Sequence, residues 1–262
     1  MTDILEELAS EARRRVAAME GEVPLETMRR MAESAPRPEG FPFEAALSSD
    51  GMSFICEVKK ASPSKGVIDP VFDYMRIAEE YEAAGASCIS VLTEPSRFLG
   101  DIRYLKEIAS RVGIPVLRKD FVVDDYMVYE ARAAGASAVL LIRSILTEDE
   151  LRHLIALAHS LGMSALVEVH DAEEMGSAVR CGARIVGVNN RNLRDFTVDP
   201  LNCLRLAGGV PEDVLFVAES GVSSRADVEA LEAGGADAVL IGESLMRSPD
   251  KAAKLAELRG SI

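Results

Sequence analysis

The chain has 262 residues, of which 43 are acidic and 29 basic, giving a formal net charge of −14. With 48% hydrophobic and 27% charged residues, its composition is that of a globular protein with a large core. The acidic excess argues against nucleic acid as a partner, and no apolar run approaches the roughly 20 residues that span a membrane, so no membrane partner is expected.

The N-terminal segment predicts a helix rather than an export signal. MTDILEELASEARRR lacks the basic start, apolar block and small-residue cleavage site of a signal peptide, so a cytoplasmic protein is expected. One helical stripe carries the apolar side chains Ile4, Leu5, Leu8, Ala12 and Val16. The run Arg13–Arg15 is interpreted as a solvated helix face. Residues 1–50 are therefore expected to form a helical extension, in which Pro36–Pro42 leads into the rest of the chain.

A repeat of about 50 residues indicates regularly spaced strands. Four segments each combine a Gly-Ala step with a short apolar run: AGASCISVL from Ala84, AGASAVLLI from Ala134, CGARIVGVN from Cys181 and GGADAVLIG from Gly234. The step suits a helix that ends at a left-handed residue, and the apolar run suits a buried strand. Four more apolar runs lie before or between these segments, at Phe54–Val58, Pro115–Leu117, Ala165–Val169 and Leu215–Ala218.

The segments between these runs have helical periodicity, as at Asp73–Ala83, Asp125–Ala133, Glu148–Ser160 and Ser224–Ala233. Thr147 and Glu150 have the spacing of a capping box for the third of these helices. Eight strands alternating with helices predict an α/β fold with a parallel sheet. We expect one domain, a (β/α)8 TIM barrel over residues 51–262 with the N-terminal helical extension packed on it. The alternative is an open doubly wound sheet, but no G-x-G-x-x-G follows the first strand.

Charged and amide side chains follow five of the predicted strands at the same end. Because residues i and i+2 share one face of a strand, these side chains are expected to point into one barrel mouth. They are Glu57, Lys59, Lys119, Glu168, Asn189, Arg191 and Glu219. A single buried ion pair is common in barrels, but burying this whole set is costly and is not required for stability. Since the active sites of such barrels lie at the carboxyl ends of the strands, we interpret the set as a functional cluster.

A phosphate site is predicted beside this cluster. The loops after the last two strands, Ser220-Gly221-Val222-Ser223 and Gly242-Glu243-Ser244, carry small residues whose backbone N–H groups can close on an anion. Ser62-Pro63-Ser64-Lys65-Gly66, after the first strand, offers hydroxyl and ammonium donors. Lysine is scarce in the chain, and four of its seven lysines fall in two short segments, one around the end of the first predicted strand and one at the end of the third: Lys59, Lys60, Lys65 and Lys119.

Several other residues admit a structural interpretation beside a functional one. Phe98 and Phe121 either flank a substrate ring or pack in the core, and His170 either joins Glu168 or is an ordinary loop histidine. The four cysteines form no C-x-x-C pair and are expected to be reduced core thiols, with Cys56 facing the helices. The three histidines lack metal-binding spacing, so no metal is expected.

Seven motifs carry a family resemblance: Glu57-Val-Lys59-Lys-Ala-Ser62-Pro63-Ser64, Leu92-Thr-Glu94 with Phe98, Leu117-Arg-Lys119-Asp120-Phe121, Leu166-Val-Glu168-Val, Val188-Asn189-Asn-Arg191-Asn-Leu193, Ala218-Glu219-Ser220-Gly221 and Ile241-Gly242-Glu243-Ser244-Leu245-Met246. In their order and spacing the chain resembles the indole-3-glycerol phosphate synthase family along essentially its whole length. It departs from the family pattern at Asp101, where serine is expected.

The resemblance implies a carboxy-lyase of tryptophan biosynthesis that needs no metal or organic cofactor. Its substrate, 1-(2-carboxyphenylamino)-1-deoxyribulose 5-phosphate, would undergo ring closure, decarboxylation and dehydration to indole-3-glycerol phosphate. The implied catalytic residues are Lys119, Glu168, Lys59, Glu57, Asn189 and Ser220. Substrate contacts are implied for Ser62, Arg191, Glu219, Phe98, Phe121 and Leu140. Phosphate contacts are implied for Ser62, Gly221, Gly242 and Glu243.

The implied roles match the chemistry. Attack of the aromatic carbon on the ketone builds negative charge on its oxygen, which calls for an acid or a cation. By resemblance, Lys119 is the general acid of ring closure and Glu168 the acid–base group of dehydration. Lys59 would hold the substrate carboxylate, Glu57 would orient the lysines, and Glu243 would present its amide with its carboxylate turned away.

Two other functions stay open on the sequence alone. A lysine-dependent aldolase would form a Schiff base at Lys119. A non-catalytic phosphate-binding barrel would bind the ligand without turnover. In each case the expected partner is a small anionic molecule, and a monomer is the expected oligomeric state.

Overall fold

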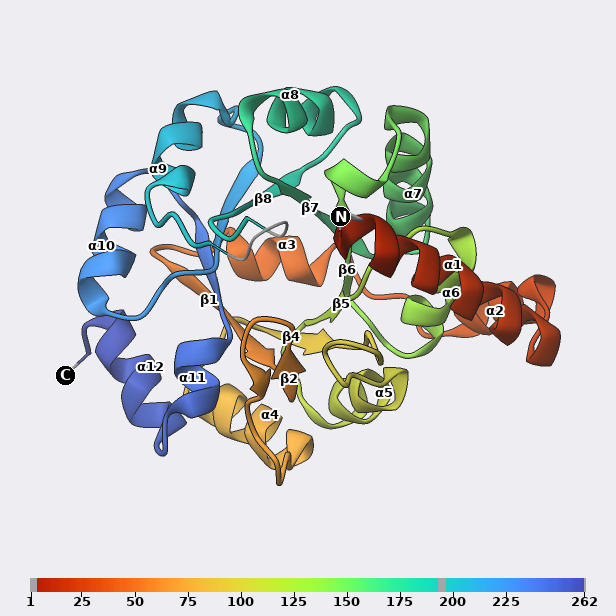
Figure 1. The fold of residues 1–262 in the computed structure, drawn as a ribbon, viewed down its shortest axis with the longest axis horizontal. Helices are drawn as coiled ribbons and strands as arrows, with labels where there is room; N and C mark the ends of the chain where they lie inside the picture. The colour runs from red at the N-terminus through yellow and green to blue at the C-terminus, as the bar shows by residue number, and fades with distance from the viewer. Residues whose placement is uncertain (1–3, 193–196, 262) are drawn as a thin grey trace.

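In the computed structural model, residues 4–192 and 197–261 are described, and eight parallel strands form a closed barrel (Figure 1). The strands are β1 (Ser53–Val58), β4 (Cys88–Leu92), β5 (Val116–Lys119), β6 (Ala138–Ile142), β7 (Ser164–Val169), β8 (Ile185–Asn189), β9 (Leu215–Glu219) and β10 (Ala238–Ile241). Each strand pairs with the next, and β1 pairs with β10 from Ser53 opposite Ala238 to Cys56 opposite Ile241. The predicted (β/α)8 barrel is confirmed, and the open sheet is wrong.

Helices surround the barrel in the predicted alternation. They are α4 (Tyr74–Ala83), α5 (Ile102–Arg111), α6 (Asp125–Ala133), α7 (Glu148–Ser160), α8 (Ala172–Arg180), α9 (Asn202–Leu206), α10 (Arg225–Ala233), α11 (Glu243–Arg247) and α12 (Lys251–Arg259), with short 3₁₀ turns at η1 (Arg143–Ile145) and η2 (Ala207–Gly209). Thr147 and Glu150 form the predicted capping box. Asp101, which departs from the family pattern, caps α5 by accepting the backbone N–H of Arg103 at 2.8 Å.

The repeated Gly-Ala step ends four of these helices as predicted. Its glycines, Gly85, Gly135, Gly182 and Gly235, have φ angles of 85°, 93°, 90° and 87°. These angles lie in the left-handed region that glycine adopts without steric cost. Each step therefore turns the chain directly from a helix into the next buried strand.

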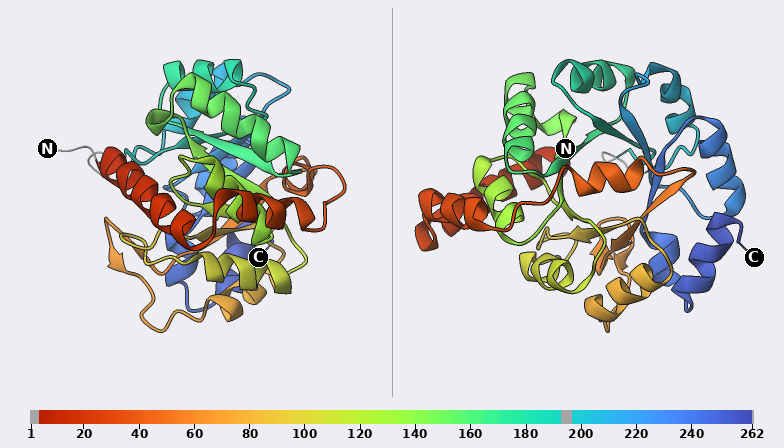
Figure 2. Two further views of the ribbon diagram at one scale, coloured as in Figure 1. Left: turned by 90° about the vertical axis from the view of Figure 1, so that its right-hand side faces the viewer. Right: turned by 180° about the vertical axis from the view of Figure 1, so that it is seen from behind.

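Three helices precede the barrel: α1 (Ile4–Glu22), α2 (Leu25–Ser34) and α3 (Pro42–Leu47). The predicted stripe of α1 is buried at Leu5, Leu8, Ala12 and Val16. The sequence did not predict α2 or α3. Helix α3 lies across the end of the barrel opposite the carboxyl ends of the strands (Figure 2), where Glu44 accepts a hydrogen bond of 3.0 Å from Ser164 at the start of β7.

The prediction that Arg13–Arg15 is a solvated face is wrong for Arg15. Arg13 and Arg14 are exposed, whereas Arg15 Nη2 donates to Asp120 Oδ1 at 2.7 Å. Asp120 is fully buried and directly follows β5. The helical pattern of α1 could not reveal a partner that lies 105 residues away in the chain.

The four cysteines are free and buried, as predicted. Burial raises the pKa of the Cys56 thiol to about 12 and that of Cys203 to about 12 as well. Only the thiolate is a strong nucleophile, so neither residue is suited to nucleophilic catalysis. Among residues 4–192 and 197–261, no helix has both the length and the apolar character that a membrane crossing requires.

Candidate active site

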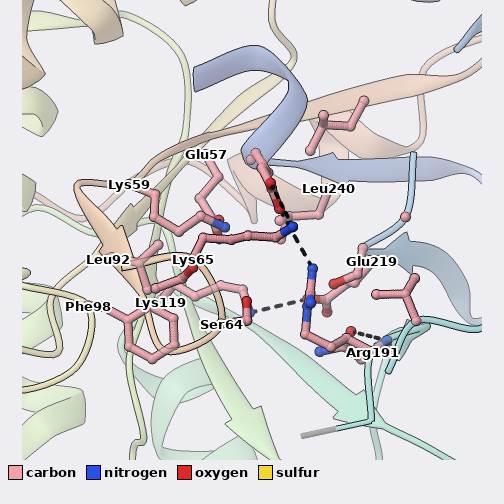
Figure 3. Close-up of a pocket in the computed structure, with 18 of the residues that line it drawn as sticks. Glu57, Lys59, Ser64, Lys65, Leu92, Phe98, Lys119, Arg191, Glu219 and Leu240 are labelled. Atoms are coloured by element: carbon pink, nitrogen blue, oxygen red, sulfur yellow. Dashed lines mark hydrogen bonds and ion pairs between the residues drawn. The ribbon is translucent and has the colours of Figure 1, made fainter. Parts of the chain in front are cut away.

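A cavity of about 720 Å³ opens at the carboxyl ends of the strands (Figure 3). Every residue that the sequence assigned to the site lines it: Glu57, Lys59, Ser62, Phe98, Lys119, Phe121, Leu140, Glu168, Asn189, Arg191, Glu219, Ser220, Gly221, Gly242 and Glu243. The i, i+2 rule correctly predicted that the charged and amide side chains at the strand ends share one cavity, because the strands are regular up to their last residues. Lys60 does not line this cavity, and Leu193 lies outside the described residues.

Lys119, the last residue of β5, lies between two carboxylates. Its Nζ is 3.2 Å from Glu219 Oε2 and 3.3 Å from Glu168 Oε2. Burial disfavours the ammonium form, but the charges of Glu219, Glu168 and Glu57 outweigh it and raise the pKa of Lys119 above its usual value. Lys119 is therefore protonated at neutral pH, as a general acid must be.

The two carboxylates beside Lys119 differ in their proton affinity. Burial raises the pKa of both groups, but at Glu168 this is outweighed by Lys119, His170 and a hydrogen bond from Asn189, so its pKa is lowered. At Glu219, burial and the nearby charge of Glu168 exceed the effect of Lys119 and raise the pKa to about 7. Two neighbouring carboxyl groups with separated pKa values can take different acid–base roles.

The Glu168 carboxylate contacts Asn189 and His170 in addition to Lys119. Its Oε1 accepts a hydrogen bond of 3.1 Å from Asn189 Nδ2 and lies 3.4 Å from His170 Nε2. The Asn189 Oδ1 in turn accepts the backbone N–H of Arg191 at 2.9 Å. Asn189 ends β8 and His170 directly follows β7. The Glu168 side chain that they contact is only 1% exposed. His170 therefore belongs to the site rather than to an unrelated loop.

Lys59 and Glu57 form a second ion pair, with Nζ 2.5 Å from Glu57 Oε1. Both side chains lie against Gly242, where a Cβ atom would collide with Glu57 Oε1 and would be 2.8 Å from Lys59 Nζ. Gly187 on β8 similarly leaves room for Glu219 Oε1. The sequence did not predict the role of Gly187, because a glycine inside an apolar run looks like any small strand residue.

The loops after β9 and β10 supply the expected anion-binding features. Ser220 and Gly221 have positive φ angles of 67° and 84°, and the Ser220 carbonyl accepts a hydrogen bond of 3.0 Å from Asn190 Nδ2. A serine in this conformation is strained, and such strain is found most often at functional sites. Ser62 reaches the same cavity from the β2–β3 hairpin (Ala61–Ser62 and Gly66–Val67).

The expectation for Glu243 is wrong in one respect. Its carboxylate does not turn away, but lies 3.5 Å from Lys65 Nζ, 3.9 Å from Arg191 Nη2 and 3.2 Å from Arg247 Nε. Lys65 and Arg191 extend into the cavity from different elements (Figure 3). Their positive charges attract the carboxylate, an effect that local sequence patterns do not contain. Arg247 was also missed, because it lies one helical turn beyond the predicted loop.

The two phenylalanines form one wall of the cavity. The ring centroids of Phe98 and Phe121 are 6.3 Å apart, and both rings line the cavity. The loop that carries Phe98 is shaped by the buried Glu94, which accepts the backbone N–H groups of Arg97 at 2.7 Å and Phe98 at 2.9 Å. This wall provides an apolar surface beside the ion pairs. Within the described ranges, no group of three or more His, Cys, Asp and Glu side chains is arranged to hold a metal ion.

Comparison with known proteins agrees with this geometry. The family profile described as indole-3-glycerol phosphate synthase matches residues 5–258. The chain is 51% identical to the indole-3-glycerol phosphate synthase of Ruminiclostridium cellulolyticum, over 98% of this chain and 99% of that protein. It is 50% identical to that of Endomicrobium trichonymphae, again over 98% and 99%.

A solved structure of 3-hexulose-6-phosphate synthase from Salmonella typhimurium shares the fold, with a TM-score of 0.66 over 80% of this chain and 97% of that one, at 16% identity. At this low sequence identity, the structural similarity shows a shared barrel fold and says nothing about function. The family match and the two relatives, which align along nearly their full length, show that this chain belongs to the indole-3-glycerol phosphate synthase family.

Proposed function

We propose that this chain is an indole-3-glycerol phosphate synthase. It converts 1-(2-carboxyphenylamino)-1-deoxyribulose 5-phosphate to indole-3-glycerol phosphate, CO2 and water, as a single-domain, monomeric and cytoplasmic enzyme that needs no cofactor. The observation that carries the proposal is the position of Lys119, whose ammonium group lies between Glu168 and Glu219 in the barrel mouth. A protonated lysine held there can donate to the ketone oxygen of a bound sugar.

In ring closure, we assign Lys119 as the general acid. When the aromatic carbon attacks the ketone, the developing alkoxide accepts the proton from Nζ, and Glu219 and Glu168 hold the lysine in place. Lys59 binds the substrate carboxylate until it leaves as CO2. Glu57, 2.5 Å from Lys59 Nζ, fixes the direction of that ammonium group.

In dehydration, we assign Glu168 as the acid–base group. Its carboxylate is oriented by Asn189 at 3.1 Å and is ionised at neutral pH because its pKa is lowered. Ser220, Arg191 and Glu219 hold the sugar hydroxyl groups, and the aromatic ring packs on Phe98, Phe121 and Leu140, which line the cavity. The phosphate is bound by Ser62 and by the backbone at Gly221, Gly242 and Glu243.

Product analysis tests this proposal. The purified protein is incubated with the carboxyphenylamino sugar phosphate, and the products are identified by mass spectrometry. Equal amounts of indole-3-glycerol phosphate and CO2 are expected. A covalent adduct at Lys119 after borohydride treatment with a ketose phosphate would instead indicate the aldolase alternative. Binding of the sugar phosphate without any product would indicate a non-catalytic barrel.

A further inference from the structure

Beyond these assignments, we propose that His170 is a positioning and proton-relay residue that connects Glu168 to a second cavity. The inference rests on the proposed function, since it concerns how a solvent proton reaches Glu168, the dehydration acid–base group, during turnover. It is carried by the position of the imidazole between two carboxylates, of which one lies in the catalytic cavity and one on helix α8.

The imidazole lies between these carboxylates, with one ring nitrogen near each. His170 Nε2 is 3.4 Å from Glu168 Oε1, and Nδ1 is 3.2 Å from Glu174 Oε2. The backbone of His170 is fixed as well, because its N–H donates to Glu174 Oε2 at 2.8 Å and its carbonyl accepts from Asn202 Nδ2 at 3.1 Å. The backbone of His170 is therefore held at the position where each ring nitrogen lies near one carboxylate.

The two sides of the ring differ in their access to water. Glu168 is 1% exposed, whereas the His170 side chain is 21% exposed and lines a separate cavity of about 430 Å³. Among the described residues, the buried Nε2 has no hydrogen-bond partner, and Glu168 Oε1 at 3.4 Å is the carboxylate oxygen it faces. Catalytic hydrogen bonds are often long without substrate and tighten when it binds.

The proton balance of the proposed reaction requires such a connection. The substrate carboxylate leaves as neutral CO2, and the ketone oxygen leaves as water, so each turnover takes up one proton from solvent. Under the proposed function, substrate bound in the catalytic cavity would restrict access to Glu168 from that side. The second cavity, which His170 shares with Glu174 and Asn189, offers a route that does not pass the substrate.

The relay step is a simple proton transfer. The Nε2–H bond of the imidazolium breaks, the proton forms an O–H bond at Glu168 Oε1, and the bonding pair stays on nitrogen as a lone pair. The neutral imidazole then regains a proton from solvent through the second cavity. In sum, one solvent proton reaches Glu168, which matches the one proton that each turnover consumes.

The surrounding charges favour the imidazolium form that this step needs. Burial disfavours it, but the hydrogen bond to Glu174 and the charges of Glu168, Glu174 and Glu219 outweigh burial and raise the pKa of His170. The other charged groups that line the second cavity are Asp171, Asp199 and Arg205. The acidic groups around the ring therefore outnumber the basic one.

Two variants test the relay. His170→Gln keeps a hydrogen-bonding side chain but cannot pass a proton, so kcat should fall about 10- to 100-fold with KM nearly unchanged. His153→Gln is the matched control, because His153 is 60% exposed and, within the part of the chain that the structure describes, pairs with Asp125 on the surface. Added imidazole should partly restore kcat in His170→Gln and should not affect the control. Unchanged kcat would overturn the relay.

Glu174→Gln separates a relay from a merely structural role. Without this carboxylate the imidazolium is less favoured, so the alkaline limb of the kcat–pH profile should move to lower pH, while the melting temperature stays close to that of the wild type. An unshifted profile would overturn the relay, even if His170→Gln does not fold. Wild-type protein that forms no indole product at all would contradict the proposed function instead.

Discussion

The guanidinium of Arg15, on the first helix, donates to the buried carboxylate of Asp120 at 2.7 Å, and Asp120 directly follows Lys119. The other oxygen of Asp120 accepts from Thr93 at 2.6 Å and from Arg118 at 3.2 Å. Burial raises the pKa of Asp120, but the charges of Arg118 and Arg15 and these hydrogen bonds outweigh it and lower the pKa. The N-terminal extension thus fixes the end of the strand that carries the proposed general acid.

We predict that Arg15→Gln lowers the free energy of unfolding by about 1–3 kcal/mol, since it weakens the pairing of a fully buried carboxylate that still retains Arg118. A several-fold loss of kcat should accompany this change, because the backbone at Lys119 becomes less constrained. Urea unfolding and steady-state kinetics provide the two measurements.

The control for this prediction is Arg14→Gln on the same helix. Arg14 is 69% exposed and pairs with Glu11, so its loss should change stability by less than about 0.5 kcal/mol. Equal effects of the two substitutions would contradict the proposed role of Arg15.

Removal of the general acid should affect turnover far more than binding. Lys119→Ala is expected to lower kcat by about 10²–10⁴-fold, with a small change in KM. Ser62→Ala, at the phosphate end, should mainly raise KM, since that contact is the same in the ground and transition states. Steady-state kinetics of both variants check the contrast. Near-normal turnover in Lys119→Ala would exclude this lysine as the acid.

Glu219 makes stability depend on pH. Its pKa is raised from 4.5 to about 7 in the folded protein, so the folded state holds a proton that the unfolded chain has released. The stability that this proton contributes is present below about pH 4.5 and is lost as pH rises through about 7. Glu219→Gln cannot ionise. Relative to wild type, it should therefore gain stability across this window, by a few kcal/mol at about 1.4 kcal/mol per pKa unit.

Denaturant unfolding of wild type and Glu219→Gln at several pH values measures this difference. Glu212→Gln is a suitable control, because Glu212 is exposed on the surface. A stability difference between wild type and Glu219→Gln that does not vary from pH 4.5 to 7 would show that Glu219 titrates normally.

The carboxylate of Glu243 should compete with phosphate for cations. Because it lies 3.5 Å from Lys65 and 3.2 Å from Arg247, its neutralisation in Glu243→Gln should tighten binding of inorganic phosphate about 3- to 10-fold. Isothermal titration calorimetry at low salt provides the measurement. Glu229→Gln, which removes a 61% exposed partner of Arg225 on α10, should leave phosphate affinity unchanged. Weaker phosphate binding in Glu243→Gln would show that the carboxylate supports the site.

The sequence predicted those features that depend on local periodicity. Strand alternation placed Glu57, Lys119 and Glu219 on the inner face because side chains in regular strands alternate without exception. Helix boundaries agreed within one residue where a capping residue such as Thr147 marks the start.

Features that depend on distant partners could not be predicted in the same way. Arg15 has the local pattern of an exposed residue, and its buried partner is set only by how α1 packs on the barrel. The carboxylate of Glu243 lies near positive charges that come from other loops. Gly187 matters because a side chain there would collide with Glu219 on the neighbouring strand. These relationships are tertiary, because the partners lie far apart in the sequence, with the exception of Arg247, which is four residues from Glu243.

The central claim is that this barrel mouth closes an indole ring. Its most direct test is the fluorescence of the wild-type protein mixed with 1-(2-carboxyphenylamino)-1-deoxyribulose 5-phosphate, followed at the emission of the indole product. We predict a continuous rise in indole fluorescence that proceeds over many turnovers without added metal or cofactor. A protein that binds this substrate and gives no indole fluorescence would contradict the claim.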